Sequence, residues 1–140
     1  MPTVSVIVPN YNHASFLGQR IDSILGQTFQ DFELILLDDS STDGSWGILE
    51  NYRNNPHVSH LIQNESNSGS AFRQWKKGIE LAQGKWIWIA ESDDYAEPSF
   101  LGRLMAEVQK TPDCVLAYAD TWWVDQQGNT LWETPHNNRV

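Results

Sequence analysis

The stretch KWIWIAESDDY (Lys85–Tyr95) runs from a short apolar segment directly into three acidic residues. The apolar part, 86–90, has the length and the aromatic and β-branched content of a buried strand. Glu91, Asp93 and Asp94 follow at the point where that strand ends. Neighbouring carboxylates repel one another and need a cation nearby. The stretch therefore predicts a strand that places a site at the rim of a sheet.

Strand and helix patterns alternate along the rest of the chain. Predicted strands cover 3–9, 32–39, 58–64, 85–91 and 114–120, and predicted helices cover 14–27, 70–84 and 97–111, with a polar turn and short helix within 40–54. The helix over 70–84 is predicted to stop at Gly84, and a hairpin over 121–133 to turn at 127–129. This alternation predicts an α/β fold, a Rossmann-like α/β/α sandwich with a mainly parallel central sheet and helices on both faces.

Length and composition bound the class of protein. The chain has 140 residues, of which 40% are hydrophobic and 19% are charged, as in ordinary globular proteins. This length predicts a single domain over 1–140, with a core over 1–120 and a hairpin and tail over 121–140. The net charge of −9 argues against binding to nucleic acid, which needs a basic surface. An anionic ligand would need a divalent cation to offset the repulsion.

The sequence predicts a cytoplasmic protein. Its single cysteine, Cys114, rules out an internal disulfide and fits a reducing compartment. Because Cys114 begins the predicted strand 114–120, we expect a buried core thiol. The opening residues MPTVSVIVPNYN lack the basic region of a signal peptide. The apolar runs are far shorter than the roughly 20 residues that cross a bilayer.

Polar residues follow every predicted strand and form the candidate site. Ligands of open α/β sheets bind at the carboxyl ends of the strands. Those ends carry Pro9-Asn10-Tyr11-Asn12, Asp38-Asp39, Asn64-Glu65, Glu91-Ser92-Asp93-Asp94 and Asp120. Hard oxygen ligands of this kind select Mg²⁺ or Mn²⁺ that bridges to a phosphate. The rim therefore predicts a metal-assisted site for a phosphorylated ligand.

Several of these residues have two interpretations. Tyr11 either packs at the rim or stacks on a flat base, and the Asp39 carboxylate can accept a hydrogen bond from a base N–H such as the uracil imide. An acid after a strand also commonly caps the next helix, which is the favoured interpretation of Asp43. Pro98 marks the first turn of the helix predicted over 97–111, so Asp93-Asp94 is not needed as its cap.

Four motifs in order resemble the N-terminal, donor-binding part of the inverting family-2 glycosyltransferases, which are nucleotide-diphospho-sugar transferases of the GT-A fold. The motifs are VSVIVPNYN, SILGQTFQDFELILLDDSSTDGS, NSGSAFRQWKKGIELAQGKWIWIAESDDY and VLAYADTWWVDQQGN. The resemblance covers about residues 2–130. It implies a GT-A sheet that is incomplete at its C-terminal side.

The resemblance also implies a role for each rim residue. The nucleotide base would contact Pro9, Tyr11 and Asp39, with Asp38 beside Asp39. In the segment that matches the family's DxD-type metal motif, Asp93 would face the ribose and, like Asp94, approach the metal.

The two remaining positions match the family less closely. Glu91, the third metal candidate, stands where the family more often has aspartate. Arg73 is the candidate for the pyrophosphate, with Lys76 as the alternative, because SAFRQWKKG departs from the usual pattern around that arginine.

The implied activity is inverting transfer of a sugar from a nucleotide-diphospho-sugar, with a UDP-sugar favoured, to a glycan or lipid-linked acceptor in polysaccharide or cell-envelope glycan synthesis. The catalytic base is expected beyond Val140, since the nearby Asp120 and Asp125 do not match its position. A non-catalytic nucleotide-sugar-binding module is the alternative. A nucleotidyltransferase is disfavoured because NYNHAS offers neither glycine nor lysine for a triphosphate. Peripheral membrane association through parts outside this chain and homo-oligomer formation both stay open.

Overall fold

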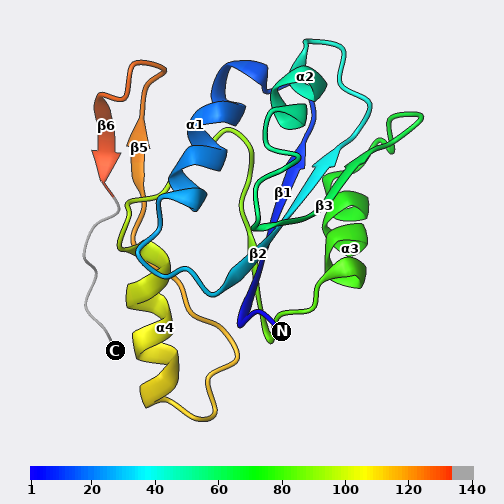
Figure 1. Ribbon diagram of the computed structural model, residues 1–140. Helices are drawn as coiled ribbons and strands as arrows, with labels where there is room; N and C mark the ends of the chain where they lie inside the picture. Colours follow the sequence, from blue (N-terminus) through cyan, green and yellow to red (C-terminus); the bar gives the residue numbers. More distant parts are fainter. Residues whose placement is uncertain (134–140) are drawn as a thin grey trace. The chain divides into compact units, whose positions relative to one another are not determined.

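The computed structural model describes residues 1–133 and divides into two compact units, Met1–Ser99 and a second that begins at Phe100 (Figure 1). This division falls earlier than the predicted boundary between a core over 1–120 and a hairpin and tail over 121–140. Residues 134–140, which belong to that predicted tail, lie outside the described residues.

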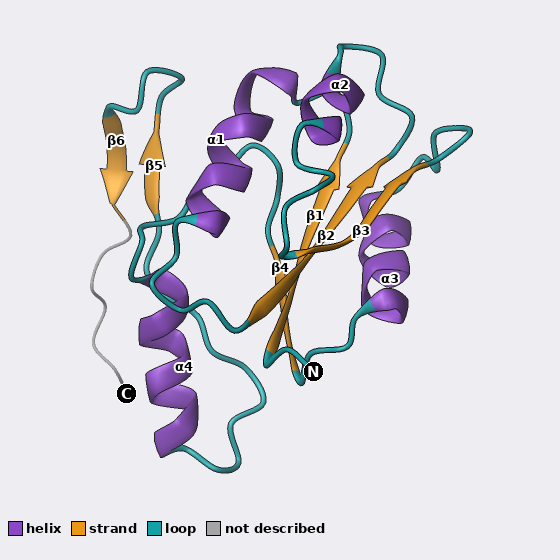
Figure 2. Ribbon diagram, in the orientation of Figure 1, coloured by secondary structure: helices purple, strands orange, loops and turns teal. Residues whose placement is uncertain are grey.

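The first unit contains a four-stranded parallel sheet with the strand order β3-β2-β1-β4 (Figure 2). Its elements follow the predicted alternation: β1 (Val4–Asn10), α1 (Ala14–Leu25), β2 (Phe32–Asp38), α2 (Ser45–Glu50), β3 (Val58–Gln63), α3 (Ala71–Leu81) and β4 (Trp86–Ile89). The predicted α/β fold with a parallel sheet is confirmed. The chain steps outward from β1 to β3 and then returns to place β4 on the other side of β1. The strand order therefore reverses between β1 and β4, which is where ligands bind in such sheets.

The two central strands are buried along their whole length, as the apolar runs in β1 and β2 predicted. Ile7 faces α3, because a Cβ on Gly78 of that helix would lie 2.4 Å from the Ile7 side chain. Side chains alternate across a strand, so Val6 and Val8 face the opposite side, where they are also fully buried. Figure 2 shows α1 and α2 on that opposite side of the sheet. Both faces of the sheet are therefore covered by helices. Because the strands are parallel, their carboxyl ends lie at one edge of the sheet.

Gly84 has a different role from the predicted one. The helix ends at Leu81, and Ala82 is already extended with ψ 136°. The connection to β4 then passes so close to β1 that a Cβ on Gly84 would lie 2.5 Å from the backbone nitrogen of Ser5. The glycine is therefore needed for this close approach and not as the cap of the helix.

The second unit contains α4 (Phe100–Lys110) and an antiparallel pair, β5 (Trp122–Val124) and β6 (Thr130–Glu133). The predicted hairpin is confirmed. Gly128 has φ +84° in the turn, and the Asp125 carboxylate accepts hydrogen bonds from the backbone of Gln127 and Asn129. Within residues 1–133, no helix is both long enough and apolar enough to span a membrane.

The predicted strand over 114–120 is wrong. These residues form a loop, Val115 and Leu116 are 90% and 76% exposed, and Cys114 is only half-buried. An apolar run becomes a strand only if another strand supplies hydrogen bonds along it. Among the described residues, strands pair only within the four-stranded sheet (β1 to β4) and within the β5–β6 hairpin. Residues 114–120 therefore have no partner strand. The prediction of a core thiol at Cys114 fails for the same reason.

Candidate functional site

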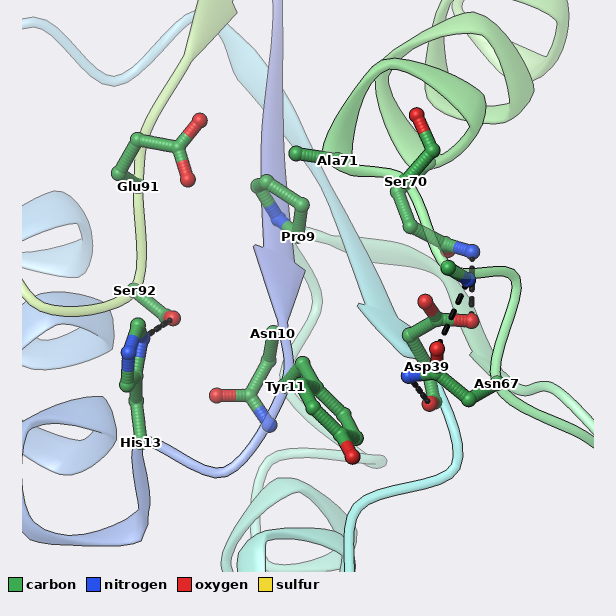
Figure 3. Close-up of a pocket in the computed structure, with 12 residues that line it drawn as sticks. Pro9, Asn10, Tyr11, His13, Asp39, Asn67, Ser70, Ala71, Glu91 and Ser92 are labelled. Atoms are coloured by element: carbon green, nitrogen blue, oxygen red, sulfur yellow. Dashed lines mark hydrogen bonds between the residues drawn. The ribbon is translucent and has the colours of Figure 1, made fainter.

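An open pocket of about 420 Å³ lies at the carboxyl ends of the strands, where β1 and β4 diverge (Figure 3). The end of β1 supplies one wall, the loops after β2 and β3 with the start of α3 supply another, and the segment after β4 supplies the third. The lining residues are Pro9, Asn10, Tyr11, His13, Asp39, Asn67, Gly69, Ser70, Ala71, Gln74, Glu91 and Ser92. Of the predicted site residues, the structure thus brings Pro9, Tyr11, Asp39 and Glu91 together in the pocket.

Asp39 is a buried carboxylate surrounded by donors, with 4% of its surface exposed. Its Oδ1 accepts hydrogen bonds from Asn64 Nδ2 (2.6 Å), the Ser68 backbone N–H (2.8 Å) and Gln74 Nε2 (3.0 Å). Its Oδ2 accepts one from Ser68 Oγ (2.7 Å). Because a carboxylate oxygen carries two lone pairs, Oδ2 retains capacity for another donor. The surroundings hold Asp39 in one orientation, ready to accept a hydrogen bond from a ligand.

Asp38 is fully buried and does not line the pocket. Its oxygens accept hydrogen bonds from Asn10 Nδ2 (2.9 Å), the Ser41 backbone (3.0 Å) and side chain (2.6 Å), and Gln63 Nε2 (3.1 Å). Side chains of successive strand residues point to opposite faces, which separates Asp38 from Asp39. Asp38 therefore ties the ends of β1, β2 and β3 together and lies outside the pocket lining.

Tyr11 lies on a loop that is pinned on both sides of it. Asn10 Nδ2 donates to Ser41 Oγ (3.2 Å), and Asn12 Oδ1 accepts a hydrogen bond from the Thr42 backbone (2.8 Å). Asn12 has φ 57°, a conformation that asparagine tolerates better than most residues. Tyr11 is 48% exposed, and its side chain borders the pocket between these anchors (Figure 3). It offers a flat, accessible surface in a fixed place.

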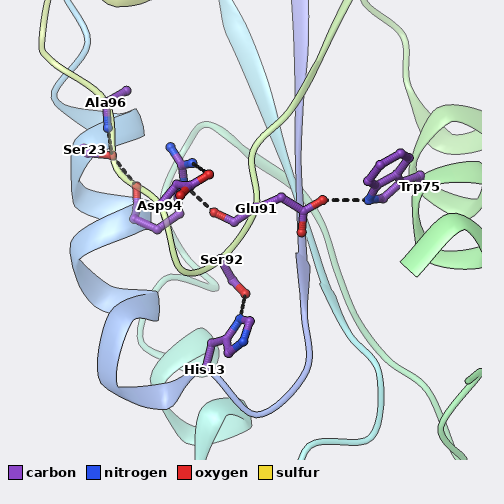
Figure 4. Close-up of polar contacts among 8 residues, drawn as sticks. His13, Ser23, Trp75, Glu91, Ser92, Asp94 and Ala96 are labelled. Atoms are coloured by element: carbon purple, nitrogen blue, oxygen red, sulfur yellow. Dashed lines mark hydrogen bonds and ion pairs between the residues drawn. The ribbon is translucent and has the colours of Figure 1, made fainter. Parts of the chain in front are cut away.

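Glu91 and Ser92 form the opposite wall, and both are held by other elements (Figure 4). Glu91 Oε1 accepts a hydrogen bond from Trp75 Nε1 (2.9 Å), and Ser92 Oγ lies 2.7 Å from His13 Nδ1. Burial raises the pKa of Glu91, and the charges of Asp93 and Asp94 raise it further, against the lowering effect of the Trp75 hydrogen bond. The negative field at this wall favours a cation.

Asp93 and Asp94 are exposed and lie outside the pocket lining. The Asp94 side chain is 72% exposed, and its Oδ2 lies 3.8 Å from Arg20 Nη2. Within residues 1–133, no group of three or more acidic, histidine or cysteine side chains is arranged to hold a metal. Mg²⁺ commonly binds one or two carboxylates together with phosphates of a substrate. The exposed oxygens here fit such a shared ion and do not form a closed cage.

Arg73 and Lys76 do not line the pocket either. Arg73 is exposed and donates through Nη1 to the backbone oxygen of Ser68 (3.0 Å), so it supports the loop that holds Asp39. Lys76 is exposed and pairs with Glu80 at 3.7 Å. Of the two, Arg73 contacts the loop that supplies the lining residues Asn67 and Gly69.

Asp43 has a structural role, as its favoured interpretation predicted. Its Oδ1 accepts a hydrogen bond from the backbone N–H of Ser45 (3.0 Å), the first residue of α2. Its Oδ2 accepts another from that of Ala14 (2.8 Å), the first residue of α1. Burial raises the pKa of Asp43, but the hydrogen bond from the Ser45 hydroxyl (2.6 Å) and those from the two backbone N–H groups favour the ionised form and lower the pKa overall.

Reasoning from sequence missed several residues of the site: His13, Asn67, Gly69, Ser70, Ala71 and Gln74 line the pocket, and Arg20 contacts the Glu91 backbone from outside the lining. Gln74 is buried and donates to Asp39 from the inner face of α3. Arg20 is 4% exposed and lies on the same face of α1 as the buried Leu17 and Ile24. Burial lowers the pKa of Arg20, while the nearby acids, Asp94 first among them, raise it. The signal for Arg20 was its spacing of three from Leu17 and four from Ile24, which places a charge on an apolar helix face.

The chain is similar to several known proteins. The family profile "Glycosyl transferase family 2" matches residues 5–138. The putative teichuronic acid biosynthesis glycosyltransferase TuaG of Bacillus subtilis (strain 168) is 32% identical over 130 residues, covering 93% of this chain and 51% of its own length. Chondroitin synthase of Escherichia coli is 32% identical over 132 residues, covering 94% of this chain and 19% of its own length.

A solved structure of S. aureus TarS 1–349 in complex with UDP-GlcNAc superimposes with a TM-score of 0.72 and 32% identity, over 79% of this chain and 32% of that one. The likeness confirms the predicted GT-A fold. This chain spans about half of TuaG, about a fifth of the chondroitin synthase and about a third of the TarS chain.

Proposed function

The chain belongs to glycosyl transferase family 2, and from that premise we propose that it binds a nucleotide-diphospho-sugar, with UDP as the favoured nucleotide, for sugar transfer to a glycan or lipid-linked acceptor. The observation that carries the proposal is the pocket between β1 and β4. The Asp39 carboxylate, an oriented hydrogen-bond acceptor, lies at one wall, and residues 91–97, here called the acidic segment, begin at the other. A nucleotide base can donate a hydrogen bond to the first wall, and a diphosphate can bind at the second through a divalent cation.

The base would lie at the wall formed by Tyr11 and Asp39. Stacking on Tyr11 buries the face of the base, and the imide N–H of uracil would donate to Asp39 Oδ2. The hydrogen bonds from Ser68 and Gln74 fix the carboxylate before any ligand arrives, so little ordering is needed on binding. Pro9 completes the edge of this wall.

The ribose and diphosphate would lie toward Glu91 and Ser92, with the exposed Asp93 and Asp94 beyond them. Asp94 and Asp93 would hold a Mg²⁺ or Mn²⁺ ion, with Glu91 as a third oxygen donor. When bound, the ion offsets the charge of the diphosphate leaving group. Arg73 would approach the diphosphate from the loop at Ser68.

Transfer with inversion requires an acceptor hydroxyl to attack the anomeric carbon. The bond from that carbon to the diphosphate oxygen breaks, the nucleoside diphosphate departs, and a carboxylate takes the hydroxyl proton. The pocket acids assigned above face nucleotide or metal, and Asp125 is engaged within its own turn. The catalytic base that takes the hydroxyl proton would therefore be a residue other than these. We place the reaction in the synthesis of a polysaccharide or cell-envelope glycan, with polysaccharide synthesis supported by the names of the two relatives. The single cysteine favours a cytoplasmic site for this reaction.

Calorimetry tests the binding part of this proposal. UDP titrated into the chain with Mn²⁺ should bind, and excess EDTA should weaken the binding strongly. ADP should compete poorly, because adenine lacks the imide N–H. Equal affinity with Mn²⁺ and with EDTA would contradict the shared metal, and equal competition by ADP would contradict the base assignment.

A further inference from the structure

One face of α1 binds the backbone of the acidic segment at several points. Arg20 Nε donates to the backbone oxygen of Glu91 (2.7 Å). Ser23 Oγ accepts a hydrogen bond from the backbone N–H of Ala96 (3.2 Å), as Figure 4 shows. Just beyond the end of α1, Gln27 Nε2 donates to the backbone oxygen of Glu97 (2.7 Å). The segment is therefore fixed at both ends, while the carboxylates between them remain exposed.

Arg20 differs from the other two residues because it brings a charge. Its guanidinium lies 5.7 Å from the centre of the Trp88 ring, and its Nη2 lies 3.8 Å from Asp94 Oδ2. That separation is too long for a hydrogen bond, so the attraction is electrostatic and the Asp94 oxygens remain available to other partners. The third nitrogen, Nη1, is buried and has no hydrogen-bond partner within residues 1–133.

A buried arginine with an unpaired N–H is a poor means of stabilising a fold. An apolar side chain of similar volume in such a place is often neutral or favourable for stability. The charge at position 20 therefore needs an explanation other than packing. The acids around it, Glu91, Asp93 and Asp94, supply one, because their mutual repulsion would otherwise spread the segment apart.

We propose that Arg20 is a positioning residue for the acidic segment: it holds the Glu91 backbone and attracts Asp94 toward α1, so that the carboxylates are already in place when a divalent cation arrives with a nucleoside diphosphate. This inference rests on the proposed function, since it names the residue that prepares the proposed metal site. Outer residues that orient metal ligands typically change metal affinity about 10- to 100-fold when replaced.

The test compares UDP affinity with Mn²⁺ and with EDTA in four variants. Arg20→Met removes the charge and keeps much of the volume. Arg20→Lys keeps the charge but cannot contact the Glu91 backbone and Asp94 through two separate nitrogens. Asp94→Asn removes the negative charge that Arg20 attracts. Arg53→Met is the matched control, because Arg53 is an exposed arginine paired with Glu50 outside the pocket. We expect the Mn²⁺-dependent gain in affinity to fall about tenfold or more in Arg20→Met, less in Arg20→Lys and not at all in the control.

The double variant Arg20→Met/Asp94→Asn separates positioning from general support. If Arg20 acts through Asp94, the double variant should lose little more of the Mn²⁺-dependent gain than Asp94→Asn alone. A merely structural role would instead lower UDP affinity equally with Mn²⁺ and with EDTA. Circular dichroism checks the fold, and Arg20→Lys carries the comparison if Arg20→Met does not fold.

The outcomes have distinct meanings. An unchanged Mn²⁺-dependent gain in folded Arg20→Met would overturn the role of Arg20, and full additivity in the double variant would overturn its action through Asp94; both would leave the proposed function standing. UDP binding by the wild-type chain that is independent of Mn²⁺ would overturn the proposed metal site and this inference with it. No UDP binding by the wild-type chain would overturn the proposed function itself.

Discussion

Asp39 and Asp94 each follow a strand of the same parallel sheet, yet their surroundings are opposite. Asp39 is 4% exposed and is bound by Asn64, Ser68 and Gln74. The Asp94 side chain is 72% exposed and has a long contact to Arg20. A carboxylate surrounded by donors recognises a neutral N–H without further help. An exposed carboxylate beside other acids needs a cation before it can attract an anion.

The largest effect should come from replacing the buried carboxylate. Asp39→Ala leaves donors of Asn64, Ser68 and Gln74 without an acceptor in a buried place, so we expect a loss of about 2–4 kcal/mol in the free energy of unfolding and loss of UDP binding. Urea denaturation and calorimetry measure the two effects. The exposed Asp113 provides the control, since Asp113→Ala should change the unfolding free energy by less than about 0.5 kcal/mol. Equal stability losses in both variants would remove the distinction between the buried and exposed acids.

The next effect isolates the exposed end of the site. Asp94→Asn should leave the unfolding free energy within about 0.5 kcal/mol of the wild type, because the side chain is exposed. The Mn²⁺-dependent gain in UDP affinity should fall about tenfold or more, as expected on losing a metal ligand. Calorimetry with Mn²⁺ and with EDTA provides the ratio. A stability loss as large as that of Asp39→Ala would show that Asp94 is part of the fold and not of a metal site.

The third effect concerns stacking at the base end. Tyr11→Ala should weaken UDP binding by about 1–3 kcal/mol, the usual contribution of one aromatic ring to base stacking. The loss should be the same with Mn²⁺ and with EDTA, because Tyr11 lies on the base side. Tyr11→Phe, which keeps the ring, should bind like the wild type, and a defect in this variant would point to the hydroxyl instead of stacking. Competition with a fluorescent UDP analogue measures all three affinities.

Much of this comparison could be predicted from the sequence because strand ends are local features. Apolar runs followed by polar residues located the ends of β1, β2 and β4, and parallel strands bring such ends to one edge. The different roles of Asp38 and Asp39 were harder to predict from the sequence. Alternation along the strand separates the two, but only the three-dimensional neighbours show that Asp38 is taken up by Asn10, Ser41 and Gln63.

Other features depend on partners distant in the sequence. Arg20 contacts a segment about 70 residues away, and Gly84 is required by the backbone of Ser5 about 80 residues earlier. Local sequence patterns do not reveal such long-range contacts. The run 114–120 shows the converse case, because its composition suits a strand while the described residues offer it no ladder. Strand propensity describes a fit to a sheet and cannot supply the neighbouring strand.

The central claim is that one pocket binds the base at Asp39 and a metal-bound diphosphate at the acidic segment. Paramagnetic broadening of backbone amide signals by Mn²⁺ tests it most directly, with Mg²⁺ as the diamagnetic control. In the presence of UDP, substoichiometric Mn²⁺ should broaden the signals of residues 91–95 most strongly and those of 64–68 much less. Broadening centred on 64–68, or spread over the surface without regard to UDP, would contradict the account.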